Sequence, residues 1–216
     1  DWQRWSEMAS LLVYRPNMWY WAGGVWGLPE VAMRKTIEDF AFLAEHKCVG
    51  LQVDTVRGHW ATQGPQYYVM AALAYDPRQD GAVLLQDYYR RAFGPAAADV
   101  EHYWNLMEGA RDAVVAAPDF KLGSRHRFGL PAIFQRVYTD DFFRRADDLM
   151  RQAERRAAED SDRYRRRVAF VRAGLDFTRR MIANIPLMDR VRATRGKDTE
   201  AVAQTIENWV AMEEIS

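Results

Sequence analysis

The chain has 216 residues, of which 49% are apolar, so it is long enough to bury a sizeable hydrophobic core. Its 30 basic residues balance 30 acidic ones, and this balance excludes long-range attraction to nucleic acid or to an acidic membrane surface. The single cysteine, Cys48, excludes an internal disulfide, and no apolar run is long enough to predict a transmembrane helix.

The first third of the sequence has the pattern of a βαβ unit followed by one more helix. Apolar spacing and flanking residues predict strands at 11–14 and 48–53 and helices at 2–9, 29–47 and 63–75. Two strands that are joined through a helix are expected to lie parallel, with a right-handed crossover between them.

The rest of the sequence is predicted to be helical. Asp80 is expected to cap a helix that ends at Gly94, and Pro95 is expected to open the next one. An irregular connection is predicted over residues 118–138, because this stretch holds two prolines and two glycines. Apolar spacing predicts three further helices, around residues 142–157, 164–182 and 202–210, and no further strand.

The two predicted strands determine the fold class that we expect. Two parallel strands do not make a stable sheet alone, because such strands normally lie inside a larger sheet with helices on its faces. We therefore predict an α/β protein in which residues 1–78 are the last βα units of a (β/α)8 TIM-like barrel. Residues 79–216 would form a mostly helical C-terminal domain, and the remainder of the barrel would come from missing sequence or another chain.

Polar and aromatic residues gather after both predicted strands. In a parallel barrel the functional groups lie where strands end and loops begin, so these residues are candidates for binding a ligand. They are Arg15, Asn17, Trp19 and Trp21 after the first strand, and Asp54, Arg57, His59, Trp60 and Tyr67 after the second.

The mixture of rings and hydrogen-bonding groups predicts a carbohydrate ligand. Indole rings stack on the apolar faces of sugar rings, while Asp, Asn, Arg and His bond to hydroxyl groups. A purely structural interpretation stays open, in which Asp54 caps its loop and pairs with Arg57 while Trp60 covers the mouth of the barrel.

A complete set of catalytic groups is not visible in the sequence. Glycoside hydrolysis usually needs two carboxyl groups that flank the bond, and only Asp54 lies convincingly at a strand end, where it could also orient a catalytic group. Glu30 is expected in the first turn of a helix, where its charge favours the helix dipole. The catalytic residues are therefore not assigned. Without paired cysteines or histidines at helical spacing, neither a metal site nor a cofactor is expected.

Two stretches carry a resemblance to a known family. The first is "DTVRGHWATQGPQYYVMAALAYDP", which contains the pattern G-x-x-Y-Y-V-x-A-x-L-x-[WY]-D-P from Gly64 to Pro77. The second is "LLQDYYRRAFGPAAADVEHYWNLME", which contains Y-Y-x-x-x-F-G-x-A-A from Tyr88 to Ala97. Together they resemble domain of unknown function 4838 over about residues 48–110.

This resemblance implies a TIM-barrel enzyme similar to glycoside hydrolase family 163. Enzymes of that kind are bacterial, usually exported, and cut N-acetylglucosamine linkages in complex N-glycans. The expected protein is therefore part of a secreted, periplasmic or cell-surface glycoside hydrolase with a carbohydrate substrate and no nucleic-acid or membrane partner. Two alternatives stay open, which are a non-catalytic carbohydrate-binding module and a helical domain that binds another protein.

Overall fold

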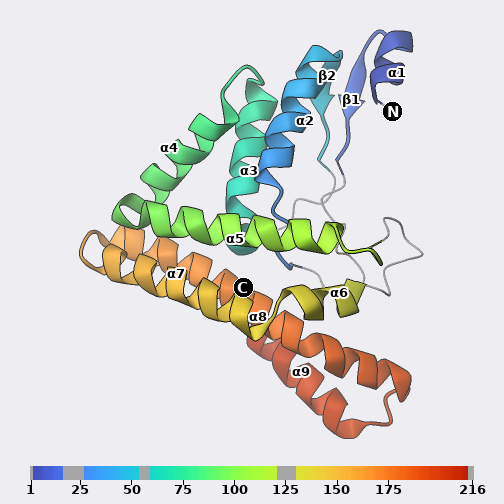
Figure 1. Ribbon diagram of the computed structural model, residues 1–216, viewed down its shortest axis with the longest axis vertical. Coiled ribbons are helices and arrows are strands. Elements are labelled where there is room, and N and C mark those ends of the chain that lie inside the picture. The colour runs from blue at the N-terminus through green and yellow to red at the C-terminus, as the bar shows by residue number, and fades with distance from the viewer. Residues whose placement is uncertain (1, 17–26, 54–58, 121–129, 214–216) are drawn as a thin grey trace.

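The computed structural model describes residues 2–16, 27–53, 59–120 and 130–213 (Figure 1). Helices dominate, and the described residues contain two short strands. In chain order the elements are α1 (Trp2–Met8), β1 (Leu12–Tyr14), α2 (Met33–Glu45), β2 (Cys48–Leu51), α3 (Trp60–Tyr75), α4 (Gly81–Phe93), the 3-10 turn η1 (Gly94–Ala96), α5 (Ala97–Val115), α6 (Leu130–Val137), α7 (Asp140–Ala158), α8 (Asp162–Ala193) and α9 (Thr199–Glu213).

The two strands pair in parallel, as the sequence predicts. Leu12 faces Cys48 and Tyr14 faces Leu51, with an irregularity in the register after Leu12. The helices α2 and α3 lie against one side of the pair (Figure 1), where Tyr14 and Leu51 pack on a small core that contains Phe40. Each strand therefore lends one face of its side chains to the packing of two helices.

The prediction of a TIM-like barrel remnant followed by a helical domain is wrong. The strands have three and four residues, and they form a two-stranded sheet in a mostly helical fold. The prediction extended the sheet because parallel strands usually have further strand neighbours. Here helices supply the buried partners, and the expectation that missing sequence or another chain completes a barrel loses its basis.

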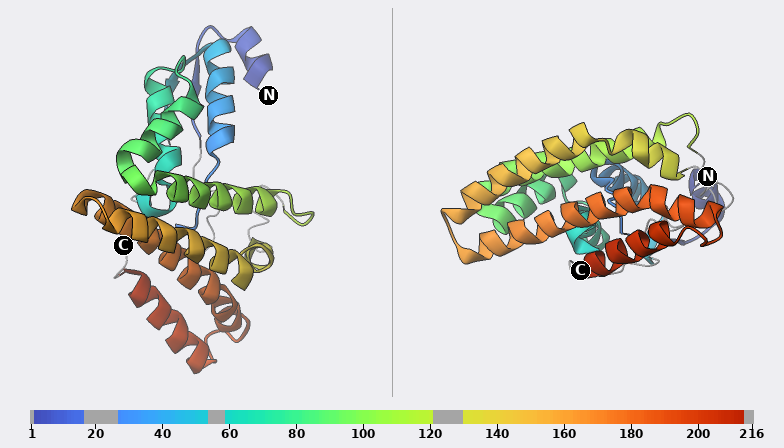
Figure 2. Two further views of the ribbon diagram at one scale, coloured as in Figure 1. Left: turned by 60° about the vertical axis from the view of Figure 1, so that its left-hand side comes forward. Right: turned by 90° about the horizontal axis from the view of Figure 1, so that it is seen from below.

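The main core lies among α4, α5, α7 and α8. Its largest buried side chains include Tyr103 and Trp104 of α5, both of which are 0% exposed. Figure 2 shows α5, α7 and α8 running alongside one another for much of their length. Leu28 and Val31, which precede α2, are buried in this same cluster. The division into residues 1–78 and 79–216 stays a prediction.

Two helices contain an internal proline, and each proline leaves a carbonyl group without its usual helical donor. In α3, Pro65 has no N–H to donate to the carbonyl of Ala61. The Ala61 carbonyl oxygen lies so close to Gly174 of α8 that a Cβ on residue 174 would overlap the oxygen. In α8, Pro186 likewise frees the carbonyl of Ile182. The side-chain amide of Gln135, from α6, donates to this oxygen at 2.8 Å.

The N-terminus of α2 is bound to α5 through a buried carboxylate. The backbone N–H of Arg34 donates to Glu108 Oε1 at 2.9 Å, and the Arg34 guanidinium lies 3.4 Å from Glu108 Oε2. Burial raises the pKa of Glu108, and the bond from the Arg34 backbone opposes this shift. The helix N-terminus attracts a negative charge, because the first N–H groups of a helix have no internal partners, but the cost of burying the charge outweighs this attraction.

Several elements differ in detail from the predictions. The helix α3 begins at Trp60 rather than near residue 63, and α6 forms inside the stretch that was expected to be irregular. Glu30 lies before the first turn of α2 instead of within it, and its side chain is buried. Cys48 is half-buried, and its thiol lies 3.4 Å from the carbonyl oxygen of Gly50.

Candidate functional site

The predicted ligand-binding residues fall into two groups. Asn17, Trp19, Trp21, Asp54 and Arg57 lie outside the residues that the structure describes. The other four are described: Arg15 is exposed just after β1, His59 precedes α3, and Trp60 and Tyr67 lie on the first turns of α3.

Trp60 and Tyr67 form an aromatic pair at the start of α3. Their ring centroids are 5.1 Å apart and the ring planes meet at 82°, so the indole stands nearly edge-on to the phenol. Trp60 is 48% exposed, whereas Tyr67 is 2% exposed. The half-exposed indole therefore rests against a buried ring, and an exposed aromatic surface of this kind can stack on a flat ligand.

His59 directly precedes Trp60, and the chain around Gly27 passes close to its side chain. Gly27 has a φ of 83°, a left-handed conformation that favours glycine. A Cβ at Gly27 would lie 2.8 Å from Phe177 Cε1 and 3.1 Å from His59 Nδ1. The segment before α2 therefore runs directly between the imidazole and α8, and only glycine fits there.

Buried polar groups lie beneath the aromatic pair. Glu30 is 9% exposed and Gln63 is 5% exposed. Burial raises the pKa of Tyr67 to about 12, and the charge of Glu30 adds to this rise. Burial also raises the pKa of Tyr138, again with Glu30 as the second cause. The carboxyl group of Glu30 therefore lies near two phenols that stay protonated at neutral pH and can donate hydrogen bonds.

Two glutamines complete this polar layer. Gln66 Oε1 accepts a hydrogen bond of 2.6 Å from the backbone N–H of Ala32, which fixes the segment that carries Glu30 against α3. Gln63 Oε1 is buried and has no hydrogen-bond partner among the described residues. A buried acceptor of this kind is costly unless some group bonds to it, so Gln63 Oε1 is an acceptor that lacks a donor among the described residues. We name Glu30, His59, Trp60, Gln63, Tyr67 and Tyr138 the α3 corner.

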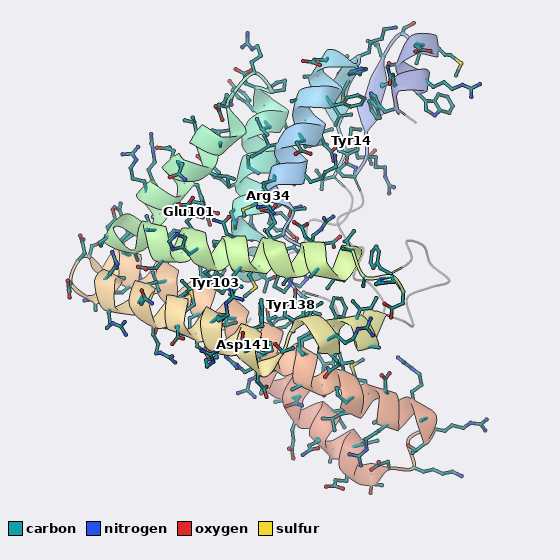
Figure 3. All side chains as sticks on the ribbon, viewed as in Figure 1. Tyr14, Arg34, Glu101, Tyr103, Tyr138 and Asp141 are labelled. Atoms are coloured by element: carbon teal, nitrogen blue, oxygen red, sulfur yellow. The ribbon has the colours of Figure 1, made fainter. Side chains whose placement is uncertain are left out.

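The sequence analysis did not predict Glu30 or Tyr138 as ligand-binding members of the α3 corner. Gln63 can be placed there from the sequence, because a polar residue four positions before Tyr67 lies on the same face of a helix. Glu30 was noticed but was interpreted only as a helix-dipole charge. Tyr138, which Figure 3 labels, carries no sequence signal, since it lies between α6 and α7, far along the chain from α3.

A groove adjoins the α3 corner at Trp60. It has a volume of about 890 Å³ and lies among α3, α4 and the first turns of α8. Its lining includes four arginines, which are Arg90, Arg91, Arg163 and Arg167. It also includes six aromatic residues, which are Trp60, Tyr68, Tyr88, Phe93, Tyr164 and Phe170. We name it the arginine groove. Trp60 is the residue that the corner and the groove share.

No metal site is apparent in the part of the chain that the structure describes, where no three His, Cys, Asp or Glu side chains gather in a way that could hold an ion. The described helices also include none that is long and apolar enough to span a membrane. The chemistry available at the α3 corner is thus stacking, hydrogen bonding and the single carboxylate of Glu30.

The fold and the corner define a mostly helical protein with a short parallel strand pair and an aromatic, hydrogen-bonding site. Residues 1–105 match the model of a family described as Domain of unknown function (DUF4838). The family predicted from the sequence motifs is therefore confirmed over this part of the chain, which includes β1, β2 and the α3 corner residues up to Tyr67. Neither a curated protein nor a solved structure matches the chain.

Proposed function

We propose that the protein binds glycans at the α3 corner, as part of a glycoside hydrolase-like protein. The observation that carries this proposal is the indole of Trp60, 48% exposed and set edge-on against Tyr67. A sugar ring stacked on this indole would place its hydroxyl groups over the buried polar layer. Gln63 Oε1 would accept a hydroxyl hydrogen, and the carboxylate of Glu30 would do the same.

The sugar class that we propose is an oligosaccharide containing N-acetylglucosamine. This choice is supported by the resemblance of the motif from Gly64 to Pro77 to a family similar to N-glycan hydrolases. Hydrolysis of a glycosidic bond needs a second carboxyl group besides Glu30, and Asp54 is the candidate that the sequence offers. A non-catalytic binding module uses the same stacking surface and needs only Glu30 as an acceptor.

The test is calorimetric titration with N-acetylglucosamine oligosaccharides and a complex N-glycan. Trp60→Ala should weaken binding by roughly tenfold or more, since stacking buries a large aromatic surface. The matched control is Trp5→Ala, because Trp5 is 60% exposed on α1, away from the corner. Unchanged affinity in Trp60→Ala, or the absence of any glycan binding, would contradict the proposal.

A second measurement separates hydrolysis from binding. Release of reducing sugar from the N-glycan, lost in Glu30→Gln while binding persists, would assign catalysis to the corner. Binding without release would assign a non-catalytic role. Thermal unfolding of each variant, followed by circular dichroism, shows whether the substitution has left the fold intact.

A further inference from the structure

We infer that the arginine groove binds the carboxylate groups of an acidic oligosaccharide, so that the glycan recognised at Trp60 carries negative charge. This inference deepens the proposed function and rests on it, because the groove and the α3 corner share Trp60. Four arginines line the groove, and its described lining residues include no carboxylate. Positive charge in a concave surface attracts anions more strongly than the same charge on a flat one.

The arginines differ in how far they are already neutralised. Arg90 and Arg91 share one carboxylate, Asp87, at 2.5 Å and 2.6 Å. Arg163 and Arg167 have no carboxylate partner within ion-pair distance among the described residues. The groove therefore keeps an excess of positive charge, and most of that excess lies on the side formed by α8.

The two α8 arginines are held in place by bonds to groups that carry no formal charge. Arg167 Nη1 donates to the carbonyl oxygens of Arg91 and Ala92 at 3.1 Å and 3.2 Å, at the C-terminal end of α4. Arg163 Nη2 donates to the hydroxyl of Tyr164 at 2.9 Å, and its guanidinium lies 4.8 Å from the centre of the same ring. A fixed guanidinium loses less side-chain freedom when it binds a carboxylate, and its remaining N–H groups suit a two-point contact.

The aromatic residues of the groove provide exposed apolar rings, which a site that binds only a small anion does not need. Phe170 is 50% exposed and Trp60 is 48% exposed. Burial raises the pKa of Tyr88 to about 12, so its hydroxyl keeps its proton and can donate. A groove that contains both exposed rings and guanidinium groups fits a chain that has both apolar sugar faces and carboxylates.

Other anionic polymers fit these observations less well. Nucleic acid is bound mainly through contacts to many phosphates along its length, and this chain has a formal net charge of zero. An acidic peptide would use the arginines but has no flat ring surfaces for the exposed indole and phenyl groups. The carboxylated oligosaccharide uses both kinds of side chain.

The experiment compares an oligogalacturonate with its methyl ester, which has the same sugar rings without the charge. Calorimetric titration at low salt should give binding of the acid that is roughly tenfold or more tighter than binding of the ester. The variants Arg163→Gln and Arg167→Gln should each weaken binding of the acid and leave binding of the ester unchanged. The control is Arg166→Gln, because Arg166 lies between them on α8 but pairs with Asp162 and does not line the groove.

Each outcome decides the inference. Tighter binding of the acid, lost in the two groove variants and kept in the control, supports it. Equal binding of acid and ester, or binding of neutral N-acetylglucosamine oligosaccharides alone, overturns the inference but leaves the proposed function standing. If no saccharide binds, both fail. Binding of polyglutamate or of a single-stranded oligonucleotide in preference to the acid also overturns it. Thermal unfolding tests whether Arg167→Gln, which loses two hydrogen bonds to α4, still folds.

Discussion

The helical body formed by α5, α7 and α8 buries most of its large apolar side chains, whereas the strand pair leaves several of its own exposed. Tyr103 and Trp104 of α5 are 0% exposed, but Val13 of β1 is 58% exposed and Val49 of β2 is 61% exposed. The difference teaches that the stability of this protein resides in its helices. The strands serve to position the chain at the edge of that body, and the buried polar groups of the α3 corner lie between the two regions.

The largest effect that this comparison predicts is at Trp104. Trp104→Ala removes a fully buried indole and should lower the free energy of unfolding by about 3–5 kcal/mol. Val49→Ala, in the strand pair, should change it by less than about 0.5 kcal/mol. Urea unfolding monitored by circular dichroism measures both, and similar losses in the two variants would show that the sheet carries as much stability as the body.

A smaller effect is expected at the crossing of α3 and α8. A methyl group at Gly174 would overlap the carbonyl oxygen of Ala61, so Gly174→Ala should cost about 1–3 kcal/mol of unfolding free energy. Gly109→Ala is the matched control, because a Cβ on Gly109 has nothing within 4 Å. This control should stabilise α5 by roughly 0.5–1 kcal/mol, since alanine is the better helix former. Equal stability of the two variants in a urea titration would mean that the crossing can relax.

The smallest effect concerns pH and the link between α2 and α5. Burial raises the folded-state pKa of Glu108, so its contribution to stability is fully present below the ordinary carboxyl pKa. That contribution is lost as the pH rises from the pKa of Glu108 in the unfolded chain through its raised pKa in the folded protein, because the carboxyl group of the unfolded chain releases its proton at the lower pH. Glu108→Gln has no proton to lose, so the stability of the wild type relative to this variant should fall over that window. Urea titrations at a series of pH values test this, and parallel profiles would exclude Glu108 as the cause.

Local signals in the sequence predicted the elements well. The Asp80 side chain accepts bonds from the N–H groups of Ala82 and Val83, as expected of a cap, and Gly94 ends α4 with a φ of 53°. The strands at 12–14 and 48–51 also follow from short apolar runs. Each of these features depends on residues within a few positions of one another, so a single sequence contains all the information needed.

The fold class and much of the site depend on distant pairs and could not be predicted in the same way. The sequence of one strand does not indicate how many strands its sheet contains. The prediction therefore relied on the general preference for larger parallel sheets, which gave the wrong fold class. The meeting of Glu30, Tyr67 and Tyr138 joins three separate parts of the chain. His59, Trp60, Gln63 and Tyr67 of the corner can be placed from the sequence, because they lie within one stretch between a predicted strand and the first turns of the next helix.

The missing helical hydrogen bond at Pro186 has a consequence for motion. The helix α8 packs on α3, α4 and α7 and also pairs with α9, and the side-chain amide of Asn208 in α9 donates to Asn184 Oδ1 just before Pro186. A helix bends most easily where a backbone bond is absent, so α8 should bend more easily at Pro186 than elsewhere along its length. The amide of Gln135 bonds to the freed carbonyl and so ties this point of α8 to α6.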